Sequence, residues 1–281
     1  MPIADGLKSV IAVFMMAVSV PASGQDAVTA PDVEIRLAAL ENNNPDDDTA
    51  ARSSLVKMGA GVVPYLKPAV LDAQKDWEVR TALVWVLGEI ASPDSRPLLK
   101  KAWELKDTPG SFKIQVAIAL GSHGEFDALR SFLVPGQADK VLVAKAAIAA
   151  ANLKDKASLS LIRAHLRDPE IGSFVAIAAC RLGDEGALEQ VRPLLKDPIF
   201  RDYAAVAVAA SGDRTVILPL RFALENGDPF IRAEAATALA RLKDHGAAEK
   251  ISALAKSDPD PRVRKAAQRA LIRMRGGRLT R

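Results

Sequence analysis

The chain has 281 residues, of which 49% are hydrophobic and only 5% aromatic, and its formal net charge is +4. This length suffices for a large core, whereas the alternating Val, Ile, Thr and Tyr runs of β-strands are nearly absent. The composition therefore excludes a β-rich fold and favours alanine-rich helices packed closely together. The single cysteine, Cys180, excludes an internal disulfide and is expected to be a buried structural thiol.

The N-terminal segment has the features of a secretory signal. Residues 10–20, VIAVFMMAVSV, form an apolar run that follows Lys8 and precedes the small residues of PASGQDA. The run is too short for a membrane-spanning helix, which needs about 20 residues. We expect a signal peptide over residues 1–24, with cleavage after Ala22 or Gly24, and export to the periplasm. If this segment is not a working signal, the protein is cytoplasmic.

The rest of the chain is dominated by a repeat of about 30 residues. The stretch PDVEIRLAALENN predicts a capping helix within residues 25–43, in front of an array over residues 44–275. A degenerate copy is expected near Lys106–Ser122, and residues 276–281 form a basic tail. The recognisable copies are NPDDDTAARSSLVKMGA (from residue 44), DWEVRTALVWVLGEIAS (76), DKVLVAKAAIAAANLKD (139), DPEIGSFVAIAACRLGD (168), DPIFRDYAAVAVAASGD (197), DPFIRAEAATALARLKD (228) and DPRVRKAAQRALIRM (260).

Each repeat predicts two helices. Asp, followed in several copies by Pro, caps the first helix, and a short turn leads to a second capping residue. Apolar residues lie four, seven and eleven positions after that second cap, so they form a stripe along one side of the second helix. One pair cannot bury its stripe alone, so the pairs stack. The expected second caps are Ser92, Ser122, Asp155, Asp184, Asp213 and Asp244.

These features predict an all-α fold, an α-solenoid of about seven helix pairs with terminal half-repeats. The pattern DPxVRxxAAxAL…LGD…A…L…L resembles HEAT repeats of the phycobilisome (PBS) lyase-like type. That resemblance implies a right-handed superhelix, second helices on the concave side and a role in protein binding. It also implies an arginine in the first helix, present as Arg80, Arg201, Arg232 and Arg264. Ala144 and Gly172 replace it in the central repeats, which predicts an irregular ladder between repeats there.

A basic residue recurs eight positions after the second cap. This position lies beside the apolar stripe, where the stem covers the core edge and the charge reaches water. One interpretation is a basic stripe that binds an acidic protein, with charge reversal at Arg163, Arg192 and Arg221 sparing the fold. The other is pairing with carboxylates of the next repeat, such as Glu189 and Glu225. The positions are Lys100, Arg130, Arg163, Arg192, Arg221 and the uncharged Ser252, with Lys67 as the equivalent in the first repeat.

Two further features are candidate contact sites. The three tryptophans lie in one repeat, where Trp103 is expected in the core. Trp85 falls at a surface position, so it is either an interface residue or packed on the irregular next repeat. Residues 261–281 carry eight basic residues and no acid, and would either contact an anionic lipid, nucleic acid or acidic protein or form a solvated cap.

No catalytic constellation is recognisable. His123, His165 and His245 lie in different repeats without metal-ligand spacing, and we expect surface roles for them. The sequence has no P-loop, GxSxG or GxGxxG, and no His-Glu pair such as deoxyhypusine hydroxylase would require. The favoured function is therefore an exported, non-catalytic scaffold or adaptor that binds another protein and needs no cofactor or metal. The alternatives are a bilin-lyase-like or other HEAT-repeat enzyme subunit, or a nucleic-acid-binding HEAT protein if the chain is not exported.

Overall fold

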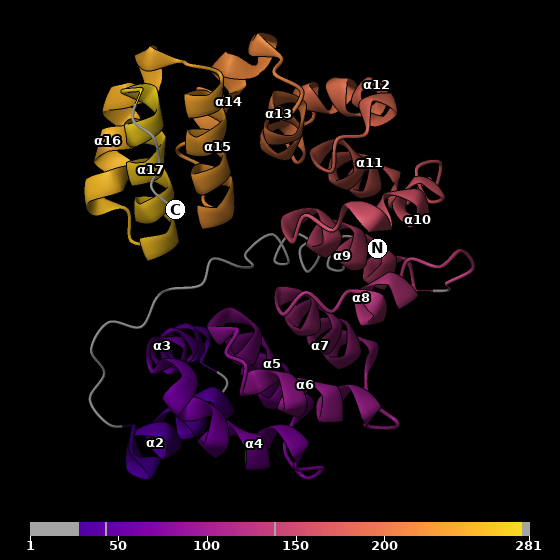
Figure 1. Cartoon of the computed structure of the whole chain (residues 1–281), viewed down its shortest axis with the longest axis vertical. Helices are drawn as coiled ribbons and strands as arrows, with labels where there is room; N and C mark the ends of the chain where they lie inside the picture. Colours follow the sequence, from indigo (N-terminus) through magenta and orange to yellow (C-terminus); the bar gives the residue numbers. More distant parts are fainter. Residues whose placement is uncertain (1–27, 43, 138, 277–281) are drawn as a thin grey trace. The chain divides into compact units, whose positions relative to one another are not determined.

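The computed structural model describes residues 28–42, 44–137 and 139–276, and every regular element in them is helical (Figure 1). The expected signal peptide and most of the basic tail lie outside the described residues. The chain divides into two compact units, and their described residues are 28–137, here the N-terminal unit, and 139–276, here the C-terminal unit. In these ranges no helix is long and apolar enough to cross a membrane.

The N-terminal unit stacks its first helices in chain order. Helix α2 contacts α3, α3 contacts α5, and α5 contacts α7, while the second helices α4 and α6 pack against them. Gly88 on α5 permits this close stacking, because a Cβ there would lie 3.0 Å from the Cβ of Ala119 on α7. The elements are α2 (Ala30–Glu41), α3 (Pro45–Lys57), η2 (Gly59–Val62), α4 (Val63–Leu71), α5 (Trp77–Ile90), α6 (Ser95–Glu104), α7 (Gly110–Ser122) and α8 (Asp127–Ser131).

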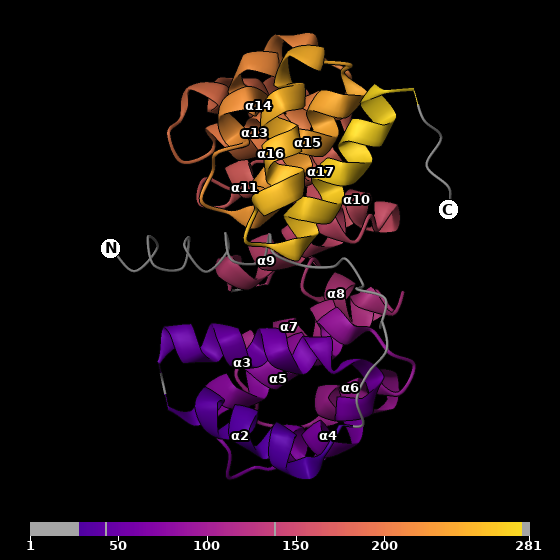
Figure 2. The ribbon, with the colours of Figure 1, turned by 90° about the vertical axis from the view of Figure 1, so that its left-hand side faces the viewer.

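The C-terminal unit repeats the same arrangement. Its first helices α9, α11, α13, α15 and α17 contact one another in that order, and α15 and α17 lie side by side (Figures 1 and 2). The elements are α9 (Lys140–Asn152), η3 (Lys156–Ser158), α10 (Leu159–Arg163), α11 (Gly172–Arg181), η4 (Glu185–Ala187), α12 (Leu188–Val191), η5 (Arg192–Lys196), α13 (Arg201–Ala209), η6 (Arg214–Val216), α14 (Ile217–Ala223), α15 (Pro229–Arg241), η7 (His245–Ala247), α16 (Ala248–Ser257) and α17 (Pro261–Met274).

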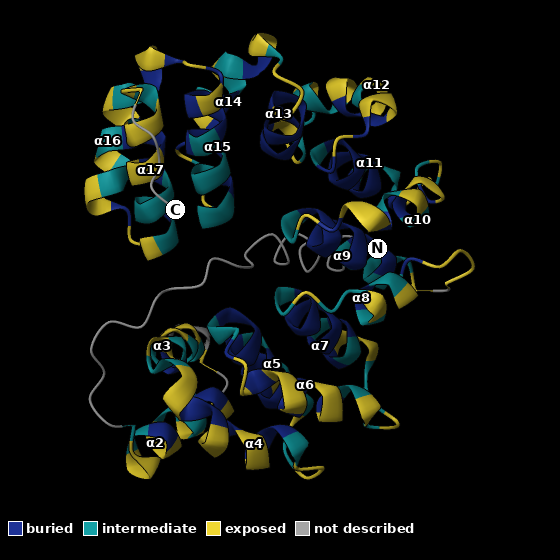
Figure 3. Ribbon diagram, viewed as in Figure 1, coloured by how far each residue is buried: buried dark blue, intermediate teal, exposed yellow. Residues whose placement is uncertain are grey.

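This element order confirms the predicted all-α repeat architecture. In the described residues, seven helix pairs lie between the single helices α2 and α17. The internal first helices α5, α7, α9, α11 and α13 are mostly buried (Figure 3), and all residues of α13 from Asp202 to Ala209 are buried. A helix enclosed by neighbours on both sides and by second helices needs small side chains, which explains the abundance of alanine.

The predicted caps are partly confirmed. Asp184 and Asp213 each accept a hydrogen bond from a backbone N–H of the second helix that they precede, and Asp228 does so for α15. Ser122 is an exception, because it ends α7 rather than starting α8. The Asp168-Pro sequence caps a turn before α11, which starts only at Gly172.

Candidate functional site

The basic residues of the second helices in the C-terminal unit bind the caps of the next repeat. The Nε of Arg163 lies 2.7 Å from an Asp184 carboxylate oxygen, and an Nη of Arg192 lies 2.7 Å from Asp213. Arg221 is bidentate on Asp244, with N–O distances of 2.8 and 2.6 Å. We call these three ion pairs the second-helix ladder.

The aspartates of this ladder serve two helices at once. Asp184 also accepts from the N–H of Gly186, and Asp213 accepts from the N–H of Thr215. The hydrogen bond from Arg163 holds the pKa of Asp184 below its usual value, and Arg221 does the same for Asp244. Asp213 also has a lowered pKa, mainly through its bonds from Thr215 and then from Arg192.

The ladder confirms the pairing interpretation for Arg163, Arg192 and Arg221, and Lys100 likewise pairs with a carboxylate of the next repeat, Glu125. The partners of the three arginines are the caps of the following repeat and not the glutamates considered from the sequence, since Glu225 pairs with Lys250. Inter-repeat pairing also persists through the central repeats, where the first-helix arginine is missing. The side chains of Arg163, Arg192 and Arg221 are nevertheless about half exposed, so the pairing leaves part of each available to solvent.

In the N-terminal unit the same sequence positions are arranged differently. Lys100 lies 3.2 Å from Glu125, which also binds Arg96, and Arg130 lies 3.5 Å from Asp127 of its own helix. Lys67 is exposed, and no ion pair is found for it within residues 28–137. The predicted basic register therefore contains a regular ladder only in the C-terminal unit.

The first-helix arginines bind structural partners. Arg80 is only 2% exposed, donates from Nε to the Val70 carbonyl at 2.9 Å and lies 4.0 Å from the Trp77 ring. Arg232 is bidentate on the buried Asp258, at 2.8 and 2.9 Å, and Arg264 donates to two backbone carbonyls ahead of its helix. Arg80 joins α5 to the end of α4, Arg264 joins α17 to the loop before it, and Arg232 joins α15 to the capping residue of the loop before α17.

Two exposed apolar residues on α14 were missed by the sequence analysis. Leu218 is 60% exposed and Phe222 is 55% exposed, and their spacing of four residues places them on one face of the helix. We call them the apolar pair. Their positions, five and nine after the cap, hold Glu189 and Pro193 in the preceding repeat and Glu249 and Ala253 in the following one. Comparison of these positions between repeats would have revealed them.

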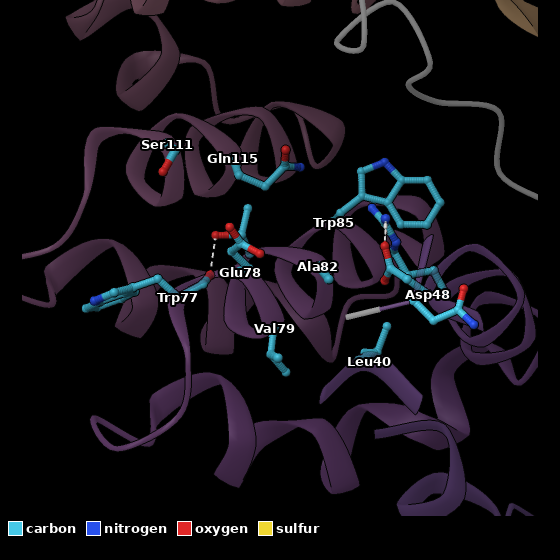
Figure 4. Close-up of a pocket in the computed structure, with 12 residues that line it drawn as sticks. Leu40, Asp48, Trp77, Glu78, Val79, Ala82, Trp85, Ser111 and Gln115 are labelled. Atoms are coloured by element: carbon cyan, nitrogen blue, oxygen red, sulfur yellow. Dashed lines mark hydrogen bonds and ion pairs between the residues drawn. The ribbon is translucent and has the colours of Figure 1, made fainter. Parts of the chain in front are cut away.

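A groove along α5 contains the predicted contact residue Trp85 (Figure 4). It has a volume of about 580 Å³, and α5 forms its floor between α3 and α7. Arg52 of α3 is paired with Asp48 and lies 5.7 Å from the centre of the half-buried Trp85 ring. We call this the α5 groove, and its lining residues are Leu40, Asn44, Asp48, Arg52, Trp77, Glu78, Val79, Thr81, Ala82, Trp85, Ser111 and Gln115.

A second hollow of about 630 Å³ lies beside α6 and contains Lys100 and Arg130. Trp103 lines it as well and is half-buried rather than fully in the core. The Trp103 ring packs edge-on against Phe132 at 6.3 Å, and the Lys113 ammonium lies 4.8 Å from it. Both hollows belong to the N-terminal unit.

The thiol and one imidazole are buried, whereas His123 is half-buried and His245 is exposed, as expected. Cys180 is buried as predicted, burial raises the pKa of its thiol to about 11, and its Sγ lies 3.4 Å from the Ala207 carbonyl oxygen. His165 was expected at the surface but is buried, because it follows α10 and lies against the core. Burial, with the Arg96 charge nearby, lowers the pKa of His123.

The comparisons with known proteins agree with this architecture. Residues 196–272 match the model of HEAT repeats, and residues 79–102 match that of the PBS lyase HEAT-like repeat. The predicted resemblance to HEAT repeats of the PBS lyase-like type is therefore confirmed. No curated protein sequence matches this chain.

Solved structures of other proteins are similar to this chain, and one of them supports the helical repeat fold. The complex of CpcE and CpcF of phycocyanin lyase from Nostoc sp. PCC7120 is similar, with a TM-score of 0.52 and 16% identity over 92% of this chain and 99% of that one. Human deoxyhypusine hydroxylase in complex with glycerol has a TM-score of 0.37 and 17% identity over 88% of this chain and 97% of that one.

Proposed function

We propose that this protein is an exported, non-catalytic repeat scaffold that binds another protein through the second-helix face of its C-terminal unit. The observation that carries the proposal is the apolar pair, in which Leu218 and Phe222 are 60% and 55% exposed. An apolar pair with a polar surround has the composition of a protein-binding surface, with a desolvated centre and a charged rim.

The ion pairs next to α14 define the chemistry of the partner. Arg192 binds Asp213, which precedes this helix, and Arg221 lies within it, next to Phe222. Their half-exposed side chains retain N–H donors toward solvent. A complementary partner presents an apolar side chain to the pair and carboxylates to the arginines. Lys67, Lys100, Arg130 and Arg163 are proposed to extend this basic surface within their own units.

The experiment is affinity capture with chemical crosslinking in extracts of the cells that make the protein. We expect the double variant Leu218→Ser, Phe222→Ser to lose the partner while its circular dichroism is unchanged. The matched control is Val134→Ser, which removes a 48% exposed apolar side chain from the other unit. Equal capture by the double variant and the wild type, or capture of no partner by the wild type, would contradict the proposal.

The arginines need a milder substitution than charge reversal. A carboxylate at position 163, 192 or 221 would face the cap aspartate of the next repeat, so reversal is now expected to destabilise the fold. Replacement of the three arginines by glutamine removes the charge and keeps hydrogen-bond donors. We expect this triple variant to stay folded and to bind its partner more weakly, with a smaller dependence on salt.

Export rests on the apolar run at residues 10–20 and is tested separately. N-terminal sequencing of the protein recovered from its cells should begin at Ser23 or Gln25. A chain that still begins near Met1 and fractionates with the cytoplasm would contradict export.

A lyase-like subunit is the second candidate function. It is favoured by the fold similarity to the CpcE and CpcF complex, which contains two different chains. An uncleaved, cytoplasmic chain would favour this candidate and also a nucleic-acid-binding role. Bilin transfer to an acceptor protein by the purified chain would support this second function and contradict the scaffold proposal.

A further inference from the structure

The α5 groove has three features that its own fold does not use. The exposed Glu78 carboxylate has no hydrogen bond or ion pair within the part of the chain that the structure describes. The Gln115 Nε2 is shielded from solvent, yet no acceptor lies within reach of it among the described residues. The Trp85 ring borders the groove and is only half covered. A shielded amide donor without a partner is uncommon in folded proteins, and it indicates a bound acceptor.

The charges around this groove favour a cation. Asp48 is neutralised by Arg52, whereas Glu78 has no ion pair among the described residues. The lining of the groove therefore holds two carboxylates and one guanidinium, and among the described residues only Asp48 of the two carboxylates is paired with that guanidinium. The contact of Arg52 with Trp85 shows that the indole of this groove accepts a cationic group over its ring.

Two of the three features lie along α5, and the third, Gln115, borders the groove from α7. Glu78 is near the start of the helix and Trp85 is seven residues later, about 10 Å along the axis. Figure 4 shows the Gln115 amide of α7 reaching over the floor of the groove, near Trp85. About three residues of extended chain would cover this distance.

We propose that the α5 groove binds a short extended peptide segment that carries a lysine or arginine. The basic side chain pairs with Glu78, a backbone carbonyl accepts from Gln115, and an apolar side chain about three residues away packs on Trp85. This inference goes beyond the proposed function, since it assigns a separate site in the N-terminal unit and names the residue type that it selects.

The experiment selects random displayed heptapeptides on the immobilised full-length protein, followed by fluorescence anisotropy with the enriched peptide. We expect enrichment of Lys or Arg, and binding that weakens with added salt. Glu78→Gln should weaken binding about tenfold, as expected for loss of a charge-assisted bond. The matched control is Glu104→Gln, an exposed carboxylate of the α6 hollow in the same unit, which should leave affinity unchanged.

Two more variants separate binding from folding. Gln115→Leu should weaken peptide binding about threefold. It should not lower the urea midpoint of unfolding, because the free protein loses only an unpaired donor. Trp85→Phe should weaken it less than Trp85→Ala. Enrichment of acidic or unbiased peptides, no enrichment at all, or equal affinity of the Glu78→Gln variant would overturn the inference. The Leu218→Ser, Phe222→Ser variant should retain peptide binding, so failure of either proposal leaves the other testable.

Discussion

The two units show two ways of joining HEAT-like repeats. In the C-terminal unit the second-helix ladder links successive repeats through arginine and the next capping aspartate. In the N-terminal unit aromatic and cationic side chains fill irregular spaces, with Arg80 enclosed by Trp77 and Phe112. Regular ion pairs therefore join the repeats of the C-terminal unit, whereas irregular aromatic and cationic packing accompanies the two hollows described in the N-terminal unit.

The largest expected difference between the two units is the loss of stability at acidic pH. In the described C-terminal unit the pKa values of Asp168, Asp184, Asp213, Asp244 and Asp260 are lowered, whereas in the N-terminal unit only that of Glu125 is. A lowered carboxyl pKa contributes stability that is present above the unfolded value, about 3.9 for Asp, and is lost as pH falls through the folded value. Burial raises the pKa of Asp228, which acts in the opposite direction.

The measurement uses the position of the tryptophans, which all lie in the N-terminal unit. Between about pH 5 and 3, the urea midpoint followed by circular dichroism should fall more than the midpoint followed by tryptophan fluorescence. Equal shifts by the two probes would show that the ladder does not distinguish the units.

The next largest effect is a difference in stability between variants of two equivalent first-helix arginines, Arg232 and Arg80. Arg232→Met leaves the buried Asp258 carboxylate without its partner and should lower the free energy of unfolding by about 3 kcal/mol. Arg80→Met leaves only the Val70 carbonyl and two rings, and should cost about 1–2 kcal/mol in urea denaturation. The reverse order would contradict the assignment of Arg232 as an ion-pair residue and Arg80 as a packing residue.

The two roles of a ladder aspartate can be separated at one position. Asp184→Ala removes both the cap and the ion pair and should destabilise by about 1–2 kcal/mol. Asp184→Asn keeps an oxygen for the Gly186 N–H and should cost less than the alanine variant. Equal urea midpoints for the two variants would mean that capping contributes nothing here.

The smallest effect is expected at Gly246. A Cβ at this position would lie too close to the guanidinium of Arg221, so Gly246→Ala should displace Arg221 from its bidentate position on Asp244. Because the long side chain can move, the cost in stability should stay below about 1 kcal/mol. The matched control is Gly227→Ala, where a Cβ meets nothing within 4 Å. An unchanged Arg221 Nε–H signal in NMR spectra would contradict the assigned contact.

Much of this fold was predictable from sequence because the repeat spacing determines which residues cap and which residues stack. The basic register was also visible, but its partners were not, since the pairing of Arg163 with Asp184 depends on how far one repeat is displaced from the next. Leu218 and Phe222 could have been found by comparing equivalent positions in the repeats. The α5 groove could not be predicted from the sequence, because it forms only when α3, α5 and α7 pack and leave Gln115 unpaired.

The central claim is that the second-helix face of the C-terminal unit binds a protein. It is tested most directly by photo-crosslinking, with a photoreactive phenylalanine analogue placed at Phe222 in one variant and at Val134 in another. The account predicts one discrete crosslinked partner from position 222 and none from position 134. Absence of a product from position 222, or the same products from both positions, would contradict it.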